Sequence, residues 1–172
     1  MLAILERKNV QATFFCLGDY IKRNPELVKQ IYEKGHLIAN HGVNHVMMPD
    51  IHEVYAAENI VEFETILKAY TGIDEEIRYF RPPSGYFSER DLEIARQCKR
   101  IPVFWGFTYR DFEEGKPKFT AEETYAVLYG NLRNGQIYQL HLVNPENNMI
   151  MEQFIDTAKA LGYSFGLVSE IA

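Results

Sequence analysis

The chain has 172 residues, of which 47% are hydrophobic and 24% are charged, and its formal net charge is −6 at pH 7. This composition is ordinary for a globular protein, and residues 1–172 are long enough to form one domain with its own core. The sequence has no basic run that would suit a nucleic acid, and no apolar stretch approaches the roughly 20 residues of a membrane-spanning helix.

Hydrophobic periodicity and helix-capping signals divide the chain into alternating helices and strands. The chain opens with an amphipathic helix through Leu2, Ile4 and Leu5. Six strands are then predicted, at 11–17, 37–40, 77–80, 101–107, 136–141 and 164–168. Between them lie helices from Asn24 to Gly35, at 53–70, from Ser88 to Lys99, from Thr120 to Leu132 and at 147–161. Strands that alternate with helices predict an α/β fold with a mainly parallel sheet.

The opening helix has no strand before it in this pattern. A parallel α/β unit normally begins with a strand that pairs with its neighbour. We therefore expect a sheet or barrel that lacks its first strand. An unpaired strand edge of this kind can associate with another chain, although the sequence leaves the oligomeric state open.

Four predicted strands end in residues that can do chemistry. His41 and His45 follow the strand at 37–40, and two imidazoles four residues apart can bind one divalent metal ion. The other three segments are Arg81-Pro82-Pro83-Ser84-Gly85, Tyr109-Arg110-Asp111-Phe112 and His141. Because parallel strands bring their carboxyl ends to one edge of a sheet, we expect all four segments to reach the same rim.

Each segment on its own also has a simpler structural interpretation. A pair of loop histidines is more often solvated than metal-binding, and Pro and Gly in the segment after Arg81 are typical of a rigid turn. Asp111 alone could be a loop charge, and a histidine in an apolar strand, such as His141, is usually a core residue. Cys16 and Cys98 are expected to be small buried hydrophobes rather than ligands. The convergence of the four segments is stronger evidence than any one of them.

Taken together, these segments resemble the polysaccharide deacetylase family, also called the NodB-homology domain or carbohydrate esterase family 4. The segment His41-Gly42-Val43-Asn44-His45 resembles the metal-binding motif H-[ST]-x-x-H, and the segment Arg81-Pro82-Pro83-Ser84-Gly85 resembles R-x-P-[YF]-G. Asp111-Phe112 resembles a D-W pair, and Leu140-His141 resembles the final L-x-H motif. Within the family the chain is most similar to the delta-lactam-biosynthetic peptidoglycan deacetylases.

The resemblance implies a distorted (β/α) barrel with fewer than eight strands, here without the first one. It also implies an enzyme that hydrolyses the acetamide of an N-acetylated glycan, with peptidoglycan favoured, to release acetate and a free amine. The family is usually exported to the cell envelope or beyond, but the sequence leaves the localisation of this chain open. His41 and His45, together with an Asp, would hold a divalent metal ion, for which zinc is favoured. A second Asp would act as the general base, and Arg81 would orient it.

The resemblance assigns roles to the remaining residues as well. The backbone N–H of Ser84 would stabilise the oxyanion, a charge that preorganised donors meet best. His141 would be the general acid that protonates the leaving amine, and Asp111 would tune it. Phe112 and Leu140 would form walls of the acetyl pocket.

The chain departs from the family pattern where the carboxylates should be. The motif T-F-D-D-G does not occur in the 172 residues, and neither does any adjacent pair of aspartates. Asp19 and Asp50 lie in the wrong segments to replace them. Two protein ligands are one fewer than a catalytic zinc site usually has, so we expect weak metal binding. Gly42 replaces the usual Ser or Thr, which removes a hydroxyl that braces the metal loop, and Phe112 replaces Trp.

Three functions are compatible with the sequence. The first is a metal-dependent deacetylase whose first strand has been lost, which the intact spacing of the later motifs favours. The second is a pseudoenzyme that binds a glycan without turnover, which the missing carboxylates favour. The third is an interaction domain without a ligand, for which the unpaired strand edge is suited. We expect a deacetylase scaffold on which the chain itself has negligible turnover.

Overall fold

The structure is a computed structural model that describes residues 1–113, 115, 118–143 and 145–171. The chain divides into two compact units. The sheet unit consists of Thr13–Phe104 and Leu167–Ser169, and the helical unit consists of Met1–Ala12, Trp105–Gly166 and Glu170–Ala172. The single domain expected for residues 1–172 stays a prediction.

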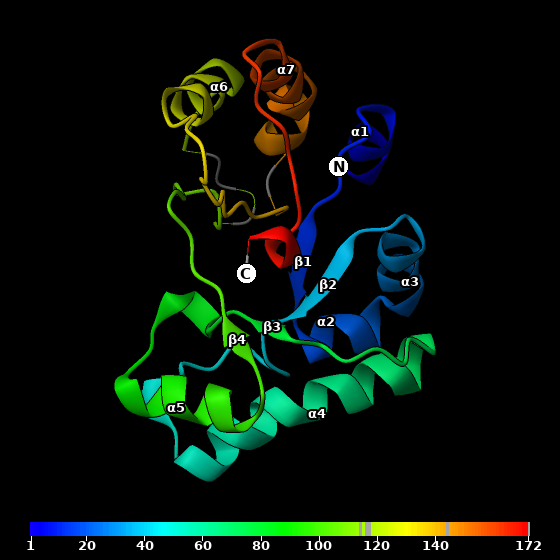
Figure 1. The fold of residues 1–172 in the computed structure, drawn as a ribbon, viewed down its shortest axis with the longest axis vertical. Coiled ribbons are helices and arrows are strands. Elements are labelled where there is room, and N and C mark those ends of the chain that lie inside the picture. Colours follow the sequence, from blue (N-terminus) through cyan, green and yellow to red (C-terminus); the bar gives the residue numbers. More distant parts are fainter. Residues whose placement is uncertain (114, 116–117, 144, 172) are drawn as a thin grey trace. The chain divides into compact units, whose positions relative to one another are not determined.

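The sheet unit contains four parallel strands in the order β1-β2-β3-β4 (Figure 1). Their bounds are β1 Thr13–Cys16, β2 Leu37–Asn40, β3 Tyr79–Phe80 and β4 Ile101–Pro102. The predicted parallel α/β sheet is thereby confirmed. Within the described part of the chain, β1 and β4 are the edge strands, while the expected incomplete barrel and any association through an edge stay predictions.

Helices connect the strands of the sheet unit, and all of them except α2, which the sequence pattern does not predict, were expected. Their bounds are α2 Gly18–Arg23, α3 Pro25–Glu33, α4 Glu53–Thr71 and α5 Glu89–Gln97, with short 3₁₀ turns at η1 Met48–Asp50 and η2 Pro83–Gly85. Pro25 occupies the first turn of α3, where its missing N–H costs no hydrogen bond. Ser88 and Asp91 form a capping box at the start of α5, and Gly72, with φ +77°, ends α4.

The core of the sheet unit forms where α4 packs against its neighbours. Figure 1 shows α4 as the long helix of this unit, and it contacts α2, α3 and α5. A cluster of buried side chains joins η1, α4, β3 and α5, with the members Met48, Ala56, Ile60, Phe80, Ile94 and Ala95. This burial fixes β3 and the start of α5, which flank the segment Arg81–Gly85.

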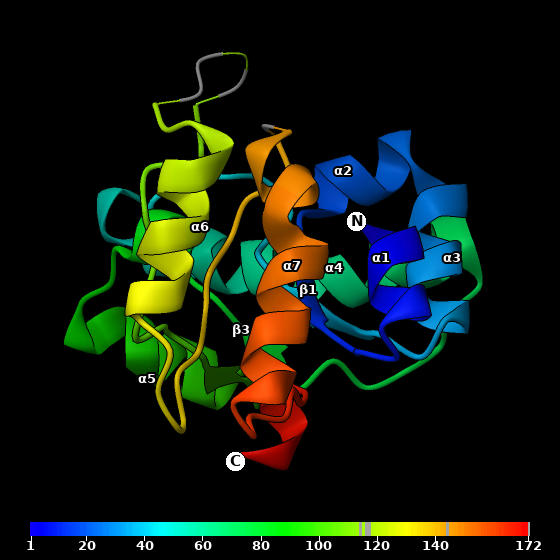
Figure 2. The ribbon, with the colours of Figure 1, turned by 90° about the horizontal axis from the view of Figure 1, so that it is seen from above.

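The described part of the helical unit contains three α-helices and the extended segments between them. Their bounds are α1 Leu2–Arg7, α6 Ala121–Gly130 and α7 Glu146–Ala160. Figure 2 shows α6 and α7 side by side, and α1 contacts α7, where Arg7 pairs with Glu152 at 2.8 Å. Thr120 and Glu123 form the predicted capping box of α6. The opening amphipathic helix and the helices predicted near residues 120 and 147 are therefore confirmed.

The later predicted strands are shorter than expected or wrong. After β4 ends at Pro102, the described residues show one ladder contact for the segments predicted at 101–107 and 136–141, an isolated bridge between Phe107 and Tyr138. The N–H groups of Gly106 and Phe107 both donate to the carbonyl of Ile137, so the chain bends there and a regular ladder cannot form. The strand predicted at 164–168 is wrong, because its last residue begins a 3₁₀ turn at η3 Val168–Glu170.

The remaining sequence predictions about the scaffold concern the cysteines and the membrane. Cys16 and Cys98 are both free, and burial raises the pKa of the Cys16 thiol to about 12, which makes it unreactive at neutral pH. Among the described helices, none combines the length and the apolar character that crossing a bilayer demands.

A buried histidine makes the sheet unit sensitive to acid. Burial lowers the pKa of His36 from its ordinary value of 6.5, and Lys34 adds to the effect. The folded state therefore favours the neutral ring. The unfolded chain takes up the proton first as the pH falls below about 6.5, so stability is full above this pH and is lost below it.

We predict that the free energy of unfolding falls as the pH is lowered from 7.5 toward 5, with His36 contributing at most about 1.4 kcal/mol per pH unit. Denaturant titrations at several pH values, on the wild type and on His36→Gln, measure this contribution. The variant should show a flatter dependence on pH. Equal slopes for the two proteins would show that His36 does not cause the acid sensitivity.

Candidate functional site

The parallel ladder delivers two of the predicted site residues to the carboxyl ends of neighbouring strands. The N–H of His41, directly after β2, donates to the carbonyl of Cys16 at 2.9 Å. The N–H of Arg81, directly after β3, donates to the carbonyl of Asn40, also at 2.9 Å. Both residues therefore continue the backbone pairing of the sheet by one step, which fixes their main chain rigidly.

The ring of His41 is oriented by the main chain of Arg81. Its Nδ1 lies 2.7 Å from the Arg81 carbonyl oxygen. A carbonyl oxygen only accepts hydrogen bonds, so Nδ1 carries the proton and Nε2 is the basic nitrogen of the ring. This is the tautomer that a histidine needs to bind a metal through Nε2, and a backbone carbonyl is a common partner for the second nitrogen of such a ligand.

His45 lies beside His41 in a geometry that suits a shared metal ion. The two ring centroids are 5.3 Å apart and the ring planes are inclined by 70°. Two imidazoles on one tetrahedral zinc ion, with Zn–N bonds of about 2.1 Å, have centroids about 5 Å apart. The pair therefore fits two positions of a zinc site. Within the described residues, no cluster of three or more His, Cys, Asp or Glu side chains could hold a metal.

Two buried asparagines brace the loop between the histidines. Asn40, the last residue of β2, accepts from the Gly42 N–H at 2.7 Å and donates to the Ile60 carbonyl at 2.8 Å. Asn59, on α4, accepts from the N–H groups of Val43 and Asn44 at 2.9 and 3.1 Å. The loop is thus held by side-chain amides from β2 and α4.

Gly42 is required by the backbone of this loop. Its φ is +86°, and a Cβ atom there would lie 2.6 Å from Nδ2 of Asn59. A Ser or Thr at this position would therefore be strained and would displace the Asn59 amide. The amide of Asn59 thus holds the loop in place of the Ser or Thr hydroxyl whose loss the sequence predicts.

Arg81 joins several strands through its buried side chain. The guanidinium carbon lies 3.9 Å from the centroid of the Phe15 ring, and Nε donates to the Val103 carbonyl at 3.1 Å. Burial lowers the pKa of Arg81 to about 10, so the group is still cationic at neutral pH. A cation held over an aromatic ring in this way stabilises the sheet edge. The predicted role of orienting a general base stays a prediction.

Ser84 occupies a strained turn after Arg81. Its φ is +57°, in the left-handed region that non-glycine residues rarely adopt, and Gly85 follows at +68°. Such a conformation costs about 1–3 kcal/mol and is concentrated at functional sites. Ser84 is exposed, and its predicted role as an oxyanion donor stays a prediction.

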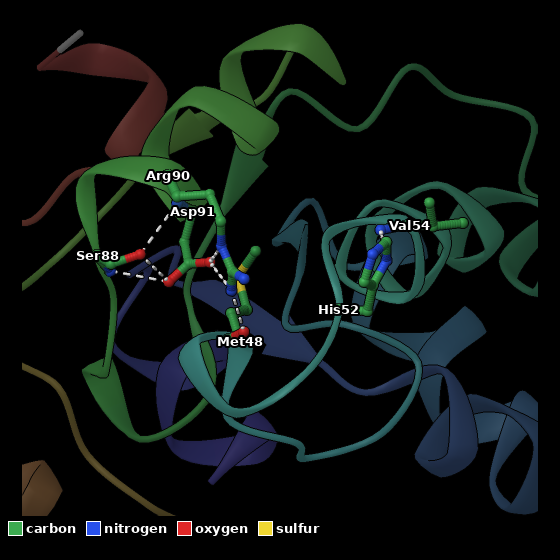
Figure 3. A network of polar contacts seen from close by, with 6 residues as sticks. All are labelled: Met48, His52, Val54, Ser88, Arg90 and Asp91. Carbon is green, nitrogen blue, oxygen red and sulfur yellow. Dashed lines mark hydrogen bonds and ion pairs between the residues drawn. The ribbon is translucent and has the colours of Figure 1, made fainter.

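A polar network connects the segment that follows His45 to the helix that follows the Ser84 turn (Figure 3). Nη2 of Arg90 donates to the Met48 carbonyl at 2.7 Å and lies 2.8 Å from Oδ1 of the buried Asp91. Although burial opposes it, hydrogen bonds from Arg90 and Ser88 lower the pKa of Asp91, so the carboxylate stays charged. The network ties η1 and the N-cap residue Ser88 to the first turn of α5.

The helical unit contains the predicted pair of Asp111 and His141. Oδ1 of Asp111 lies 2.7 Å from Nδ1 of His141, and Oδ2 accepts from the His141 main-chain N–H at 2.7 Å. Asp111 is buried, whereas the His141 ring is about one-third exposed. The exposed ring of Phe112 lies edge-on to that of His141 with centroids 5.9 Å apart, and Leu140 is half-buried.

Two further residues of this network are given no role by the sequence. The side chain of Asn147 donates to Oδ2 of Asp111 at 2.8 Å and to the His141 carbonyl at 2.9 Å. The hydroxyl of Tyr109 donates to Oδ1 of Asn147 at 2.8 Å. In the sequence, Tyr109 belongs to a segment predicted to reach the rim, and Asn147 contributes to the resemblance to the delta-lactam-biosynthetic deacetylases, but neither feature reveals the bonds that the two residues make.

The structure thus brings the predicted residues together in two groups. His41, His45 and Arg81 are in contact in the sheet unit, and Asp111, Phe112 and His141 are in contact in the helical unit. The expectation that all the segments reach one rim stays a prediction.

Comparison with known proteins shows the family. The polysaccharide deacetylase family matches residues 1–101, and the chain belongs to this family. Its four parallel strands and intervening helices are those of a carbohydrate esterase family 4 fold.

Three similar proteins illustrate the relationship. An uncharacterized 30.6 kDa protein of Geobacillus stearothermophilus is 31% identical over 99% of this chain and 64% of its own length. The peptidoglycan-N-acetylmuramic acid deacetylase PdaA of Bacillus subtilis is 29% identical over the same shares of the two chains. The solved structure of PdaA matches 98% of this chain and 71% of its own chain with a TM-score of 0.91 and 27% identity.

The third protein is BA3943 of Bacillus anthracis, described as a pseudoenzyme of carbohydrate esterase family 4. Its structure matches 98% of this chain and 58% of its own chain, with a TM-score of 0.88 and 23% identity, so the likeness shows the fold alone. The chain spans about 64% of the length of the first two relatives.

The tight contact at Gly42 predicts that one added methyl group lowers the stability of the fold strongly. Gly42→Ala should lower the free energy of unfolding by about 2–4 kcal/mol, because it adds displacement of Asn59 to the cost of positive φ. Gly72→Ala is the matched control, since Gly72 also has positive φ but no atom lies within 4 Å of the added carbon. It should cost about 1–2 kcal/mol. Chemical denaturation measures both losses, and equal losses would contradict the role of the Asn59 contact.

Proposed function

We propose that the chain is the catalytic scaffold of a peptidoglycan deacetylase, which hydrolyses the acetamide C–N bond of an N-acetylated sugar. The observation that carries the proposal is the pair of imidazoles at His41 and His45, with the first ring held by the Arg81 carbonyl in the tautomer that a metal requires. Family membership and the similarity to PdaA support the choice of peptidoglycan as the substrate.

His41 and His45 would hold a divalent metal ion, and their imidazole nitrogens suit zinc. When bound, such an ion polarises the amide carbonyl and lowers the pKa of a water molecule toward about 7. The role of His41 is to offer Nε2 in a fixed direction, because its Nδ1 proton is engaged by the Arg81 carbonyl. The loop bonds from Asn40 and Asn59 keep the two rings in place.

His141 would serve as the general acid for the leaving amine. Oδ1 of Asp111 accepts a hydrogen bond from Nδ1–H of His141, so Nε2 is the nitrogen that takes up and delivers a proton. Phe112, edge-on to the His141 ring, and Leu140 would form apolar walls for the acetyl methyl group.

The turn after β3 would stabilise the negative charge that develops on the carbonyl oxygen. The left-handed conformation of Ser84 turns its peptide group away from the regular backbone path, and the residue is exposed. A backbone N–H that is already oriented costs no reorganisation in the transition state. Arg81 would orient the general base of the reaction.

A second function, glycan binding without turnover, is favoured by one specific observation. The 172 residues contain no adjacent pair of aspartates, and the described residues offer no third metal ligand near His41 and His45. A chain without this pair of aspartates lacks the general base that the family resemblance requires. It would retain the loops that recognise the sugar.

An activity assay distinguishes the two functions. We predict that the 172-residue chain releases no acetate above background from N-acetylated peptidoglycan fragments, with or without added zinc. Fusion of a strand bearing Thr-Phe-Asp-Asp-Gly in front of the chain should restore acetate release that depends on zinc. In the fused protein His141→Ala should lower the rate about 10²–10⁴-fold, as loss of a general acid does.

His52→Ala is the control, since His52 lies outside all the motifs and should leave the rate of the fused protein unchanged. Acetate release by the unfused chain would show that the missing carboxylates are not essential. A fused protein that binds the glycan but stays inactive supports the second function. Full activity of the His141→Ala variant would rule out the role of His141 as the general acid.

A further inference from the structure

Asn147, to which no catalytic role has been assigned, lies at the centre of a polar network with the motif residues Asp111 and His141. Its amide makes three hydrogen bonds, to the Asp111 carboxylate, to the His141 carbonyl and to the Tyr109 hydroxyl. We infer that Asn147, fixed by Tyr109, is a positioning residue that holds Asp111 so that His141 is kept as a single tautomer with its proton on Nδ1. The inference rests on the proposed role of His141 as the general acid.

The hydrogen-bond pattern of the carboxylate explains why an amide is needed. Oδ1 of Asp111 pairs with Nδ1 of His141, and Oδ2 accepts from both the His141 N–H and Nδ2 of Asn147. The two bonds to Oδ2 fix the plane of the carboxylate, and with it the direction in which Oδ1 meets the ring. A carboxylate free to rotate would hold the imidazole less firmly, so both neutral tautomers would be populated.

Asn147 also fixes the main chain of His141. Nδ2 donates both to Oδ2 of Asp111 and to the carbonyl of His141. One amide group therefore connects Asp111, which orients the His141 ring, to the backbone of His141 itself. Asn147 belongs to the first turn of α7 and is only 1% exposed. Its position is therefore set by a 15-residue helix rather than by a loop.

Tyr109 determines which way the amide faces. Its hydroxyl donates to Oδ1 of Asn147, which leaves Nδ2 directed toward Asp111. Burial raises the pKa of Tyr109 to about 12, so the phenol keeps its proton and remains a donor at neutral pH. The Tyr109 ring is itself held edge-on by Phe119, with centroids 5.5 Å apart.

The neighbouring residue Asn148 provides a matched control. It lies in the same turn of α7, and its Oδ1 is buried without a hydrogen-bond partner. Asn148 has no recorded bond to Asp111 or to His141 among the described residues. Replacement of either asparagine by leucine removes an amide of similar size from the same helix, but only one replacement removes bonds to the Asp111–His141 pair.

Ring ¹⁵N NMR of the 172-residue chain, recorded above the titration of its histidines, tests the inference without any need for activity. In the wild type His141 should show one tautomer, with Nδ1 protonated and Nε2 unprotonated. Asn147→Leu should add a second set of signals from the Nε2–H tautomer, while Asn148→Leu should leave the wild-type spectrum unchanged. Tyr109→Phe, which keeps the asparagine but frees its amide, should add the same second set at lower population.

Each outcome has a defined meaning. If folded Asn147→Leu keeps a single Nδ1–H tautomer, as Asn148→Leu does, Asn147 serves packing alone and the inference is wrong. If Asn147→Leu does not fold, Tyr109→Phe decides, and an unchanged His141 spectrum in that variant overturns the inference. A tautomer change without activity in the fused enzyme would leave the inference standing and would count against the proposed function.

Discussion

The hydrogen bond between Nδ1 of His41 and the carbonyl of Arg81 is the interaction on which the account depends. It exists because β2 and β3 are parallel neighbours, so that the residues directly after them are brought side by side. Through this bond the pairing of the strands determines which nitrogen of His41 is basic. The braces from Asn40 and Asn59 then hold the His45 ring at the distance that a shared metal ion would require.

The two proposed functional histidines differ in the partner of Nδ1, and the difference fits their proposed tasks. The carbonyl that His41 faces holds the Nδ1 proton and leaves Nε2 to act as a ligand. The ring of His141 donates instead to the carboxylate of Asp111, which leaves its Nε2 to exchange a proton. In both cases the backbone or a buried side chain holds Nδ1 and Nε2 performs the chemistry.

Local signals predicted the helices well. The cap at Ser88 and the capping box at Thr120 are both predicted from the sequence, and both form. The strands predicted at 136–141 and 164–168 are wrong because apolar and aromatic residues that pack singly give the same pattern as a buried strand. Phe165, which packs against Phe154 at 6.3 Å, is an example. The motif residues were found because chemistry restricts their type, whereas Asn59 and Asn147 were missed because their partners are distant in sequence and depend on the tertiary fold.

The most direct test of the central claim is a zinc titration of the 172-residue chain followed by ring ¹⁵N NMR of its histidines. The account predicts that His41 keeps its proton on Nδ1 throughout, while the Nε2 signals of His41 and His45 shift together at a zinc concentration that leaves His52 unchanged. Loss of the Nδ1 proton of His41 on zinc binding would contradict the account. So would a titration in which His41 and His45 respond no earlier than the solvent-exposed His52.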